Sequence, residues 1–200
     1  HGNSTLENST QNALTILDVA ERRHIPVYHG AEKPLMREGS NALGAHGKGG
    51  LGGLTFTPQG RPQDGYAALE LVDRVMASPG EITLIALGPL TNVALALSIE
   101  PRPAEHLDEL ILMGGAVLTY GNISAAASFN LYCDPEAAAI VYQSGAPIVQ
   151  VGLDVCRKVA FNSRHLERIE QANTPTTQFL SRITAYRVKA YRDAMGDEAD

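Results

Sequence analysis

A group of neutral polar side chains lies between two stretches that predict a strand and a helix. The intervening loop carries Asn122, Ser124, Ser128 and Asn130. Amide and hydroxyl groups of this kind form hydrogen bonds with hydroxyls and bring no positive charge to a phosphate. So long a loop inside a compact domain is more often functional than a plain connection. These residues therefore predict a site for a neutral, hydroxyl-rich ligand.

The flanking stretches predict where this site lies. Residues 110–113 are all apolar and indicate a buried strand. On the other side, Asp134 can cap a helix, Pro135 suits its first turn, and Gly145 can end it. A strand, a loop and a helix in this order place the loop at the carboxyl end of a parallel strand, where open α/β sheets bind their ligands.

The rest of the chain alternates strand and helix signals. Further strands are predicted at 25–28, 82–87 and 147–153, and helices after Asn3, at 66–77, 93–99 and 163–172, and from Thr174-Pro175 onward. In the first of these helices, Ser4 and Glu7 have the spacing of a capping box. This alternation predicts an α/β fold with a mostly parallel sheet, and residues 1–200 as a single domain. Since the series neither opens nor closes on a strand, we expect the domain to be incomplete at both termini.

Composition excludes several classes of function. The formal net charge is −6 and no basic run occurs, so a nucleic-acid partner is not expected. No apolar run approaches the length of a membrane span, which predicts a protein without a membrane partner and, by default, a cytoplasmic one. The two cysteines, Cys133 and Cys156, make no disulfide framework and are expected to be buried free thiols.

A glycine-rich segment, residues 46–53, carries one imidazole and one ammonium group. Glycines with a lysine suggest a phosphate cradle, but Lys48 is followed by Gly49, so the Ser or Thr of a Walker motif is missing. No strand immediately precedes the segment and no helix immediately follows it. Phosphate binding is therefore not expected, and a mobile surface loop is the simpler interpretation.

Six motifs in register resemble one known family. They are HGN-x-x-LE-x-x-x-x-NA (1–13), HGKGGLGG (46–53), ALGPLTNVALAL (86–97), LMGGA (112–116), GN-x-x-x-AA-x-FN-x-Y-x-DPEAA (121–138) and VGLDV (151–155). The chain resembles the nucleoside hydrolases of the inosine–uridine-preferring family nearly end to end. The resemblance implies a Rossmann-like α/β fold that hydrolyses the N-glycosidic bond of ribonucleosides to ribose and a free base.

The resemblance also implies one Ca²⁺ ion that holds the ribose diol and the attacking water. Leu87 matches the position whose backbone carbonyl binds this ion. The family's aspartate ligands belong to motifs that would lie before His1 and after Asp200, outside this chain. Hydrolysis would pass through an oxocarbenium-like transition state, and residues 1–200 alone are expected to be inactive.

Several residues match ribose contacts of the family. Asn130 would bond the ribose hydroxyls, Asn122 the far hydroxyl of the sugar, and Met113 would lie under the ring. The alternatives are a loop cap for Asn130, a turn residue for Asn122 and ordinary strand core for Met113. Ser128 occupies the ribose-site position where the family usually has Glu, so ribose orientation or sugar preference is expected to differ.

Two residues match catalytic or base-contacting positions. Asn3 would orient the water or the ribose, and its alternative role is to cap the following helix. His46 would lie against the nucleobase, where its alternative is an exposed histidine in a glycine loop. Cys156 and Arg157 stand where the family commonly has Thr and His, and both are expected to serve packing or a neighbouring loop.

Two other functions stay open beside the hydrolase. One is a catalytically silent module that binds nucleosides or ribose, which the missing aspartates and Ser128 would permit. The other is a related enzyme acting on another N-glycoside or a ribosyl conjugate. The resemblance further suggests a homodimer or homotetramer whose partner is a small-molecule nucleoside.

Overall fold

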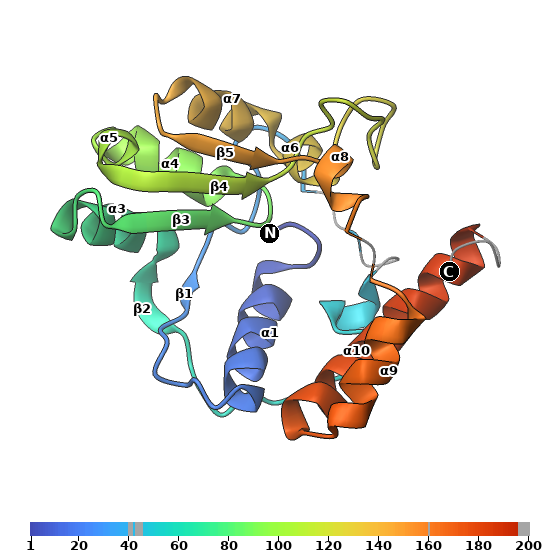
Figure 1. Cartoon of the computed structure of the whole chain (residues 1–200). Coiled ribbons are helices and arrows are strands. Elements are labelled where there is room, and N and C mark those ends of the chain that lie inside the picture. The colour runs from blue at the N-terminus through green and yellow to red at the C-terminus, as the bar shows by residue number, and fades with distance from the viewer. Residues whose placement is uncertain (40–41, 43–45, 160, 196–200) are drawn as a thin grey trace. The chain divides into compact units, whose positions relative to one another are not determined.

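The computed structural model describes residues 1–39, 42, 46–159 and 161–195, which group into two compact units (Figure 1). The sheet unit comprises His1–Gly2, Tyr28–Ser40 and Asp64–Val159, and the helical unit comprises the remaining segments. Each unit is described by itself. The single domain expected from the sequence stays a prediction.

A three-stranded parallel sheet forms the centre of the sheet unit. Its strands are β3 (Ile82–Ala86), β4 (Leu107–Met113) and β5 (Ile148–Val151), in the order β3-β4-β5. Leu110 pairs with Leu84 on one side and with Ile148 on the other. Because all three strands run the same way, the loops after them leave from one edge. The predicted α/β fold with a parallel sheet flanked by helices is confirmed.

Helices form a layer against this sheet (Figure 1). They are α3 (Ala67–Ala77), α4 (Thr91–Ile99), α5 (Pro103–His106) and α7 (Pro135–Gln143). The core between helices and sheet is apolar and includes Leu110 and Leu112 of β4, both fully buried, with Ala94 of α4 and Val141 of α7. Burial of these side chains fixes which face of each helix turns inward.

Short elements follow the strands of this sheet. Two single-turn helices, α6 (Phe129–Cys133) and α8 (Leu153–Cys156), lie near the ends of β4 and β5 (Figure 1). A separate two-stranded sheet pairs β1 (Tyr28–His29) with β2 (Gln63–Tyr66). The strand predicted at 25–28 thus begins three residues late and is shorter than expected.

The helical unit contains α1 (Leu6–Val19), the 3₁₀ turn η1 (Lys48–Gly50), α9 (Ser163–Ala172) and α10 (Pro175–Met195). The rings of Phe56 and Phe179 lie 5.1 Å apart, between centroids. Gly52, at a φ of +63°, lies so close to Tyr186 of α10 that a Cβ would be 2.8 Å from that side chain. The glycine-rich segment is therefore closely packed against α10 at this point.

Two local predictions are wrong. The cap of α1 is Thr5, whose hydroxyl accepts a hydrogen bond from the Asn8 N–H at 3.2 Å, and not Ser4 of the predicted capping box. The stretch 82–87, predicted to be buried throughout, is partly buried on one side and exposed on the other, since Ile85 and Leu87 are 59% and 71% exposed. β3 is an edge strand of its sheet, and its apolar composition does not by itself bury both of its faces.

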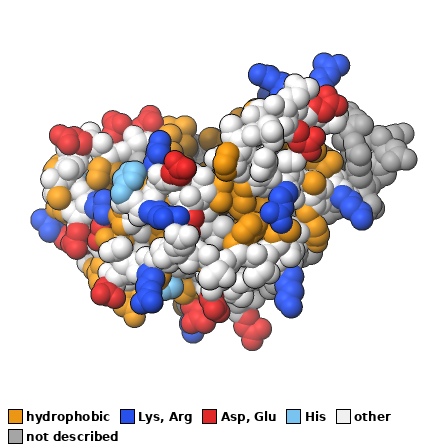
Figure 2. Space-filling view, turned by 90° about the horizontal axis from the view of Figure 1, so that it is seen from below, with side chains coloured by type: hydrophobic (Ala, Val, Ile, Leu, Met, Phe, Trp, Pro, Cys, Tyr) orange, Lys and Arg blue, Asp and Glu red, His pale blue; other side chains and the backbone are white. Residues whose placement is uncertain are grey.

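The surface agrees with the charge balance of the sequence. On the face seen in Figure 2, Lys and Arg side chains lie scattered among Asp and Glu side chains and do not gather into one basic patch. None of the described helices combines the length and apolarity needed to cross a membrane. No disulfide joins the two cysteines; Cys133 is buried, as predicted, whereas Cys156 is only half-buried.

Candidate functional site

Asn130 ties together the ends of two strands. Its Nδ2 donates to the carbonyl oxygen of Met113, the last residue of β4, at 2.9 Å. It also lies 3.1 Å from the carbonyl oxygen of Leu87, which follows β3 directly. The Met113 sulfur is a third close atom, at 3.1 Å. Three of the residues predicted for the site therefore meet at the carboxyl edge of the sheet.

Ser128 lies at the start of the same helix and is buried, at 1% exposure. Its hydroxyl accepts a hydrogen bond from the Gly115 N–H at 2.6 Å. The carbonyl of Gly114 accepts from the Gln150 side chain at 2.9 Å. Gly115 has a φ of +86°, and a Cβ there would overlap the Gln150 amide, so this turn requires glycine. Ser128 thus fixes the glycine turn after β4.

Asn122 projects from the loop between that turn and α6. Its Oδ1 accepts from the Phe129 N–H, at the first residue of α6, at 2.7 Å. The residue is exposed, and its NH₂ group has no partner among the described residues. With the oxygen engaged by the protein, Asn122 offers an outward-facing donor.

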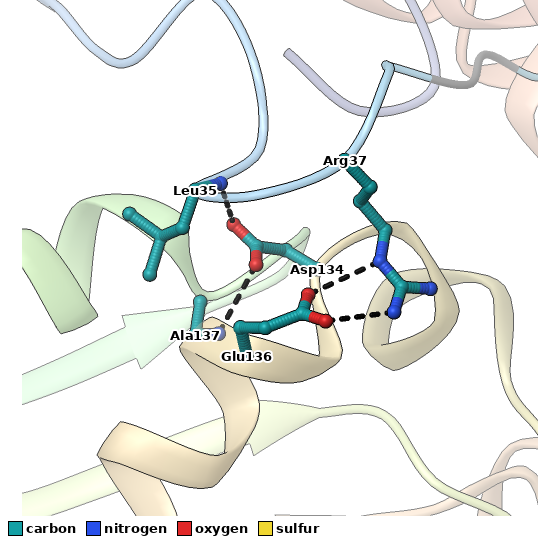
Figure 3. A network of polar contacts seen from close by, with 5 residues as sticks. All are labelled: Leu35, Arg37, Asp134, Glu136 and Ala137. Atoms are coloured by element: carbon teal, nitrogen blue, oxygen red, sulfur yellow. Dashed lines mark hydrogen bonds and ion pairs between the residues drawn. The ribbon is translucent and has the colours of Figure 1, made fainter.

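The Asp134 carboxylate accepts hydrogen bonds both from the start of helix α7 and from a loop that is distant in sequence (Figure 3). The side chain is completely buried and accepts from the N–H of Ala137, which confirms the predicted cap. It also accepts from the N–H of Leu35 at 3.0 Å. Alongside, the Arg37 guanidinium bonds both oxygens of Glu136 and lowers the pKa of that carboxyl.

A chain of polar contacts continues from Asp134 through Thr91 to His1. The Thr91 hydroxyl donates to Asp134 at 2.5 Å, and the Nε2 atom of His1 lies 2.7 Å from the same hydroxyl. Since Thr91 has one hydrogen and gives it to the carboxylate, the His1 Nε2–H must be the donor to Thr91. Next to Thr91, the Asn92 oxygen accepts from the Ala31 N–H at 2.7 Å. These contacts anchor the segment after β1.

The two remaining predicted residues belong to the helical unit. Asn3 is exposed, and its backbone carbonyl accepts from the Ala42 N–H at 3.1 Å. Because Thr5 caps α1, the alternative role of Asn3 as the helix cap does not hold. His46 is half-buried and its carbonyl accepts from the Gly52 N–H at 2.9 Å. Their predicted roles beside the sheet-unit residues stay predictions.

The ionisation of His46 is set by its surroundings. Burial lowers the pKa of the imidazole from its ordinary 6.5, and the positive charge of Arg187 lowers it further. Both effects disfavour the charged form, so His46 is neutral at physiological pH. A neutral imidazole can donate from one ring nitrogen and accept at the other, which suits contact with the polar edge of a base.

Sequence reasoning missed two groups that shape this edge. Gln150 holds the Gly114 carbonyl, and its signal was a single amide inside the apolar strand of residues 147–153. Thr91 gave no such signal, because hydroxyls are common at the first turn of helices. The expectation that Arg157 serves a neighbouring loop is confirmed by its bonds to Thr119, Tyr120 and Gly121.

The described residues alone do not make a cation site. Hard ions such as Ca²⁺ take six to eight oxygen ligands, several of them carboxylates. Leu87 offers one carbonyl oxygen at the sheet edge, but no group of three His, Cys, Asp or Glu side chains comes together in the described part of the chain. Residues outside this set would have to supply the carboxylates.

The fold and the site define a class of protein. It is an α/β protein that places amide and hydroxyl groups at the carboxyl edge of a parallel sheet, and no cluster of three His, Cys, Asp or Glu side chains that could hold a metal ion occurs in the described part of the chain. Such an edge suits a small neutral ligand.

Comparison with known proteins identifies the family. The model of the family described as inosine-uridine preferring nucleoside hydrolase matches residues 1–199, and the chain belongs to this family. A pyrimidine-specific ribonucleoside hydrolase, RihB, of Escherichia coli is 37% identical over 196 residues, which are 98% of this chain and 62% of that protein. The chain therefore spans less than two thirds of the length of this relative.

Solved structures of nucleoside hydrolases resemble this chain. A plant nucleoside hydrolase (PpNRh1) superposes with a TM-score of 0.92 at 36% identity, over 96% of this chain and 62% of the plant protein. A purine-preferring ribonucleoside hydrolase of Gardnerella vaginalis has a TM-score of 0.95 at 28% identity, over 100% of this chain and 65% of that one. The Rossmann-like fold expected from the resemblance is the fold of these proteins.

Proposed function

We propose that the protein hydrolyses the N-glycosidic bond of ribonucleosides to ribose and a free base. Membership of the nucleoside hydrolase family is the observation that carries this proposal. The relatives differ in base preference by name, one being pyrimidine-specific and another purine-preferring. The proposal therefore specifies the ribonucleoside and leaves the base open.

The chemistry needs a clamp on the sugar and help for the departing base, because the transition state resembles an oxocarbenium ion. In the proposal, Asn122 and Asn130 bind ribose hydroxyls, Met113 lies under the ring and Ser128 shapes the turn beside it. The Asn122 amide supports this assignment, since the residue is exposed and its NH₂ group has no hydrogen-bond partner among the described residues. His46 contacts the base as a neutral imidazole, and Asn3 orients the water or the ribose.

A Ca²⁺ ion completes the proposed site. The Leu87 carbonyl would supply one ligand, and carboxylates beyond the described residues would supply the others. A bound ion of this kind supplies a polarised water and a template for the ribose diol. Since residues 1–200 lack the family's Asp-x-Asp-Pro-Gly-x-Asp-Asp motif, we propose that this stretch alone does not hydrolyse nucleosides.

One assay tests these points together. The full-length gene product should release base from uridine or inosine, lose this activity on treatment with a calcium chelator, and regain it with added Ca²⁺. Base release by residues 1–200 alone, under the same conditions, would contradict the proposed dependence on outside carboxylates. Light scattering of the same sample measures whether the protein is the homodimer or homotetramer that we propose for a cytoplasmic member of this family.

A second function is compatible with the same site. The sheet-unit residues could bind a nucleoside or ribose without cleaving it, because the groups they present are neutral hydrogen-bonding groups. This alternative predicts saturable nucleoside binding by the full-length product with no base release. The chelator assay separates the two functions.

A further inference from the structure

Arg157 lies just after α8 and reaches the loop that carries Asn122. Its Nη1 donates to the Thr119 hydroxyl at 2.6 Å and to the Tyr120 carbonyl at 2.7 Å. Its Nη2 donates to the Gly121 carbonyl at 3.2 Å. The guanidinium also lies over the Tyr120 ring, 3.8 Å from its centroid. One side chain therefore holds three consecutive residues that lead directly into Asn122.

The loop segment beyond this point is a compact turn of its own. The N–H groups of Gly121 and Asn122 donate to the carbonyls of Ala125 and Ala127, at 2.9 and 3.0 Å. A Cβ on Gly121 would overlap the carbonyls of Ser124 and Ala127, so the backbone is closely packed at this position. A turn that is closed by its own bonds moves as one body. Holding Gly121 therefore also holds the position of Asn122.

Among the described residues, the other hydrogen bonds that join this loop to its surroundings lie toward its two ends. At its start, the Gly115 carbonyl accepts from the Leu153 N–H at 2.9 Å and its N–H donates to Ser128. At its far end, Asn122 accepts from Phe129. Between these ends Val117, Leu118 and Tyr120 are exposed, at 67%, 86% and 70%, and they have no core to pack against. The side chain of Arg157 binds the middle of the loop through these hydrogen bonds.

We propose that Arg157 is a positioning residue that sets the outward donor of Asn122 for a sugar hydroxyl. This inference rests on the proposed function, because it assigns Asn122 to the sugar. A fork of five donors suits the task, since three acceptors at different angles must be reached at once. Lysine carries its donors on a single nitrogen and lacks the planar fork by which Arg157 reaches these acceptors from two nitrogens.

The test compares Arg157→Ala with a matched control in the full-length gene product. The control is Arg102→Ala, which removes an exposed arginine of the same unit that bonds only the Glu100 side chain. Hydrogen exchange of the loop amides, including Gly121, Asn122 and Ile123, should become at least about tenfold faster in Arg157→Ala and stay unchanged in the control. Unchanged exchange in Arg157→Ala would overturn the inference, whatever the activity.

Kinetics supply the second readout. With uridine or inosine, whichever is hydrolysed, Arg157→Ala should raise KM about tenfold and change kcat by less than about threefold. When Asn122→Ala is already present, adding Arg157→Ala should raise KM little further, because the donor that Arg157 positions is already absent. Multiplying effects in the double variant would overturn the inference. If the wild-type protein cleaves no nucleoside, the proposed function fails, and the exchange measurement still decides whether Arg157 holds the loop.

Discussion

Replacing Asp134 by alanine should destabilise the protein far more than any other loss of a single carboxylate near α7. The side chain is fully buried and accepts three hydrogen bonds, from Ala137 N–H, Leu35 N–H and the Thr91 hydroxyl. These donors come from a helix start, a remote loop and a neighbouring helix. Alanine would leave all three without this acceptor, two of them at buried hydrogen bonds and that of Leu35 at a part-buried one.

The magnitude follows from the separate contributions. Loss of a helix N-cap costs about 1 kcal/mol of unfolding free energy. A part-buried N–H left without a partner, here that of Leu35, costs roughly 1–3 kcal/mol more. Thr91 can turn its hydroxyl toward another acceptor, so its share is smaller. The sum is about 2–5 kcal/mol, against a total stability of about 5–15 kcal/mol for a typical domain.

Urea unfolding of the full-length product, followed by circular dichroism, measures this change. Glu136→Ala is the matched control, because Glu136 is an acidic residue of the same first turn that pairs with Arg37 at the surface (Figure 3). An exposed pair contributes little, so the control should unfold close to wild type. If Asp134→Ala lowered the unfolding free energy no more than Glu136→Ala does, the inferred buried junction would be refuted.

Two further predictions concern the site. Ser128→Ala should lower the unfolding free energy, measured by urea unfolding, by about 1–3 kcal/mol, because the buried Gly115 N–H loses its acceptor. The control Ser124→Ala removes an exposed bond to Ala127 and should lower the unfolding free energy less. Equal losses in the two variants would contradict this role of Ser128. The lowered pKa of His46 means that the unfolded chain binds more protons below pH 6.5, so the contribution of His46 to stability is complete above that pH and declines as the pH falls. His46→Gln should therefore make the fall of unfolding free energy between about pH 7 and pH 5 shallower than in wild type, and parallel curves would show that the environment of His46 is wrongly described.

Much of the local structure was predictable because its causes are local. The helix at 163–172 and the one opened by Pro175 follow from apolar spacing and from their first residues, and α9 has the predicted bounds. The Asp134 cap is also local, since the carboxylate reaches an N–H three residues ahead. The cap of α1 was misjudged because Ser4 and Thr5 are adjacent hydroxyls that could both serve.

The partners of each polar group depended on residues far away in the chain. No spacing rule connects Asp134 with Leu35 across 99 positions, or Asn130 with the carbonyl of Leu87 across 43. The loop bonds of Arg157 are of the same kind, 36 to 38 residues apart in sequence. The exposed side of β3 was unpredictable as well, because burial depends on what packs on each face.

The sequence by itself determined the order of strands and helices, the family, and the side chains that gather after β4. Periodicity, caps and glycine turns act within a few residues, so they are legible along the chain. Only the tertiary structure decided that the Asn130 amide bridges two strand ends, that Asn122 turns its donor outward, and that Arg157 holds the loop. The physical reason is that a hydrogen bond depends on distance and direction in space, and the parallel sheet sets both by bringing remote loops to one edge.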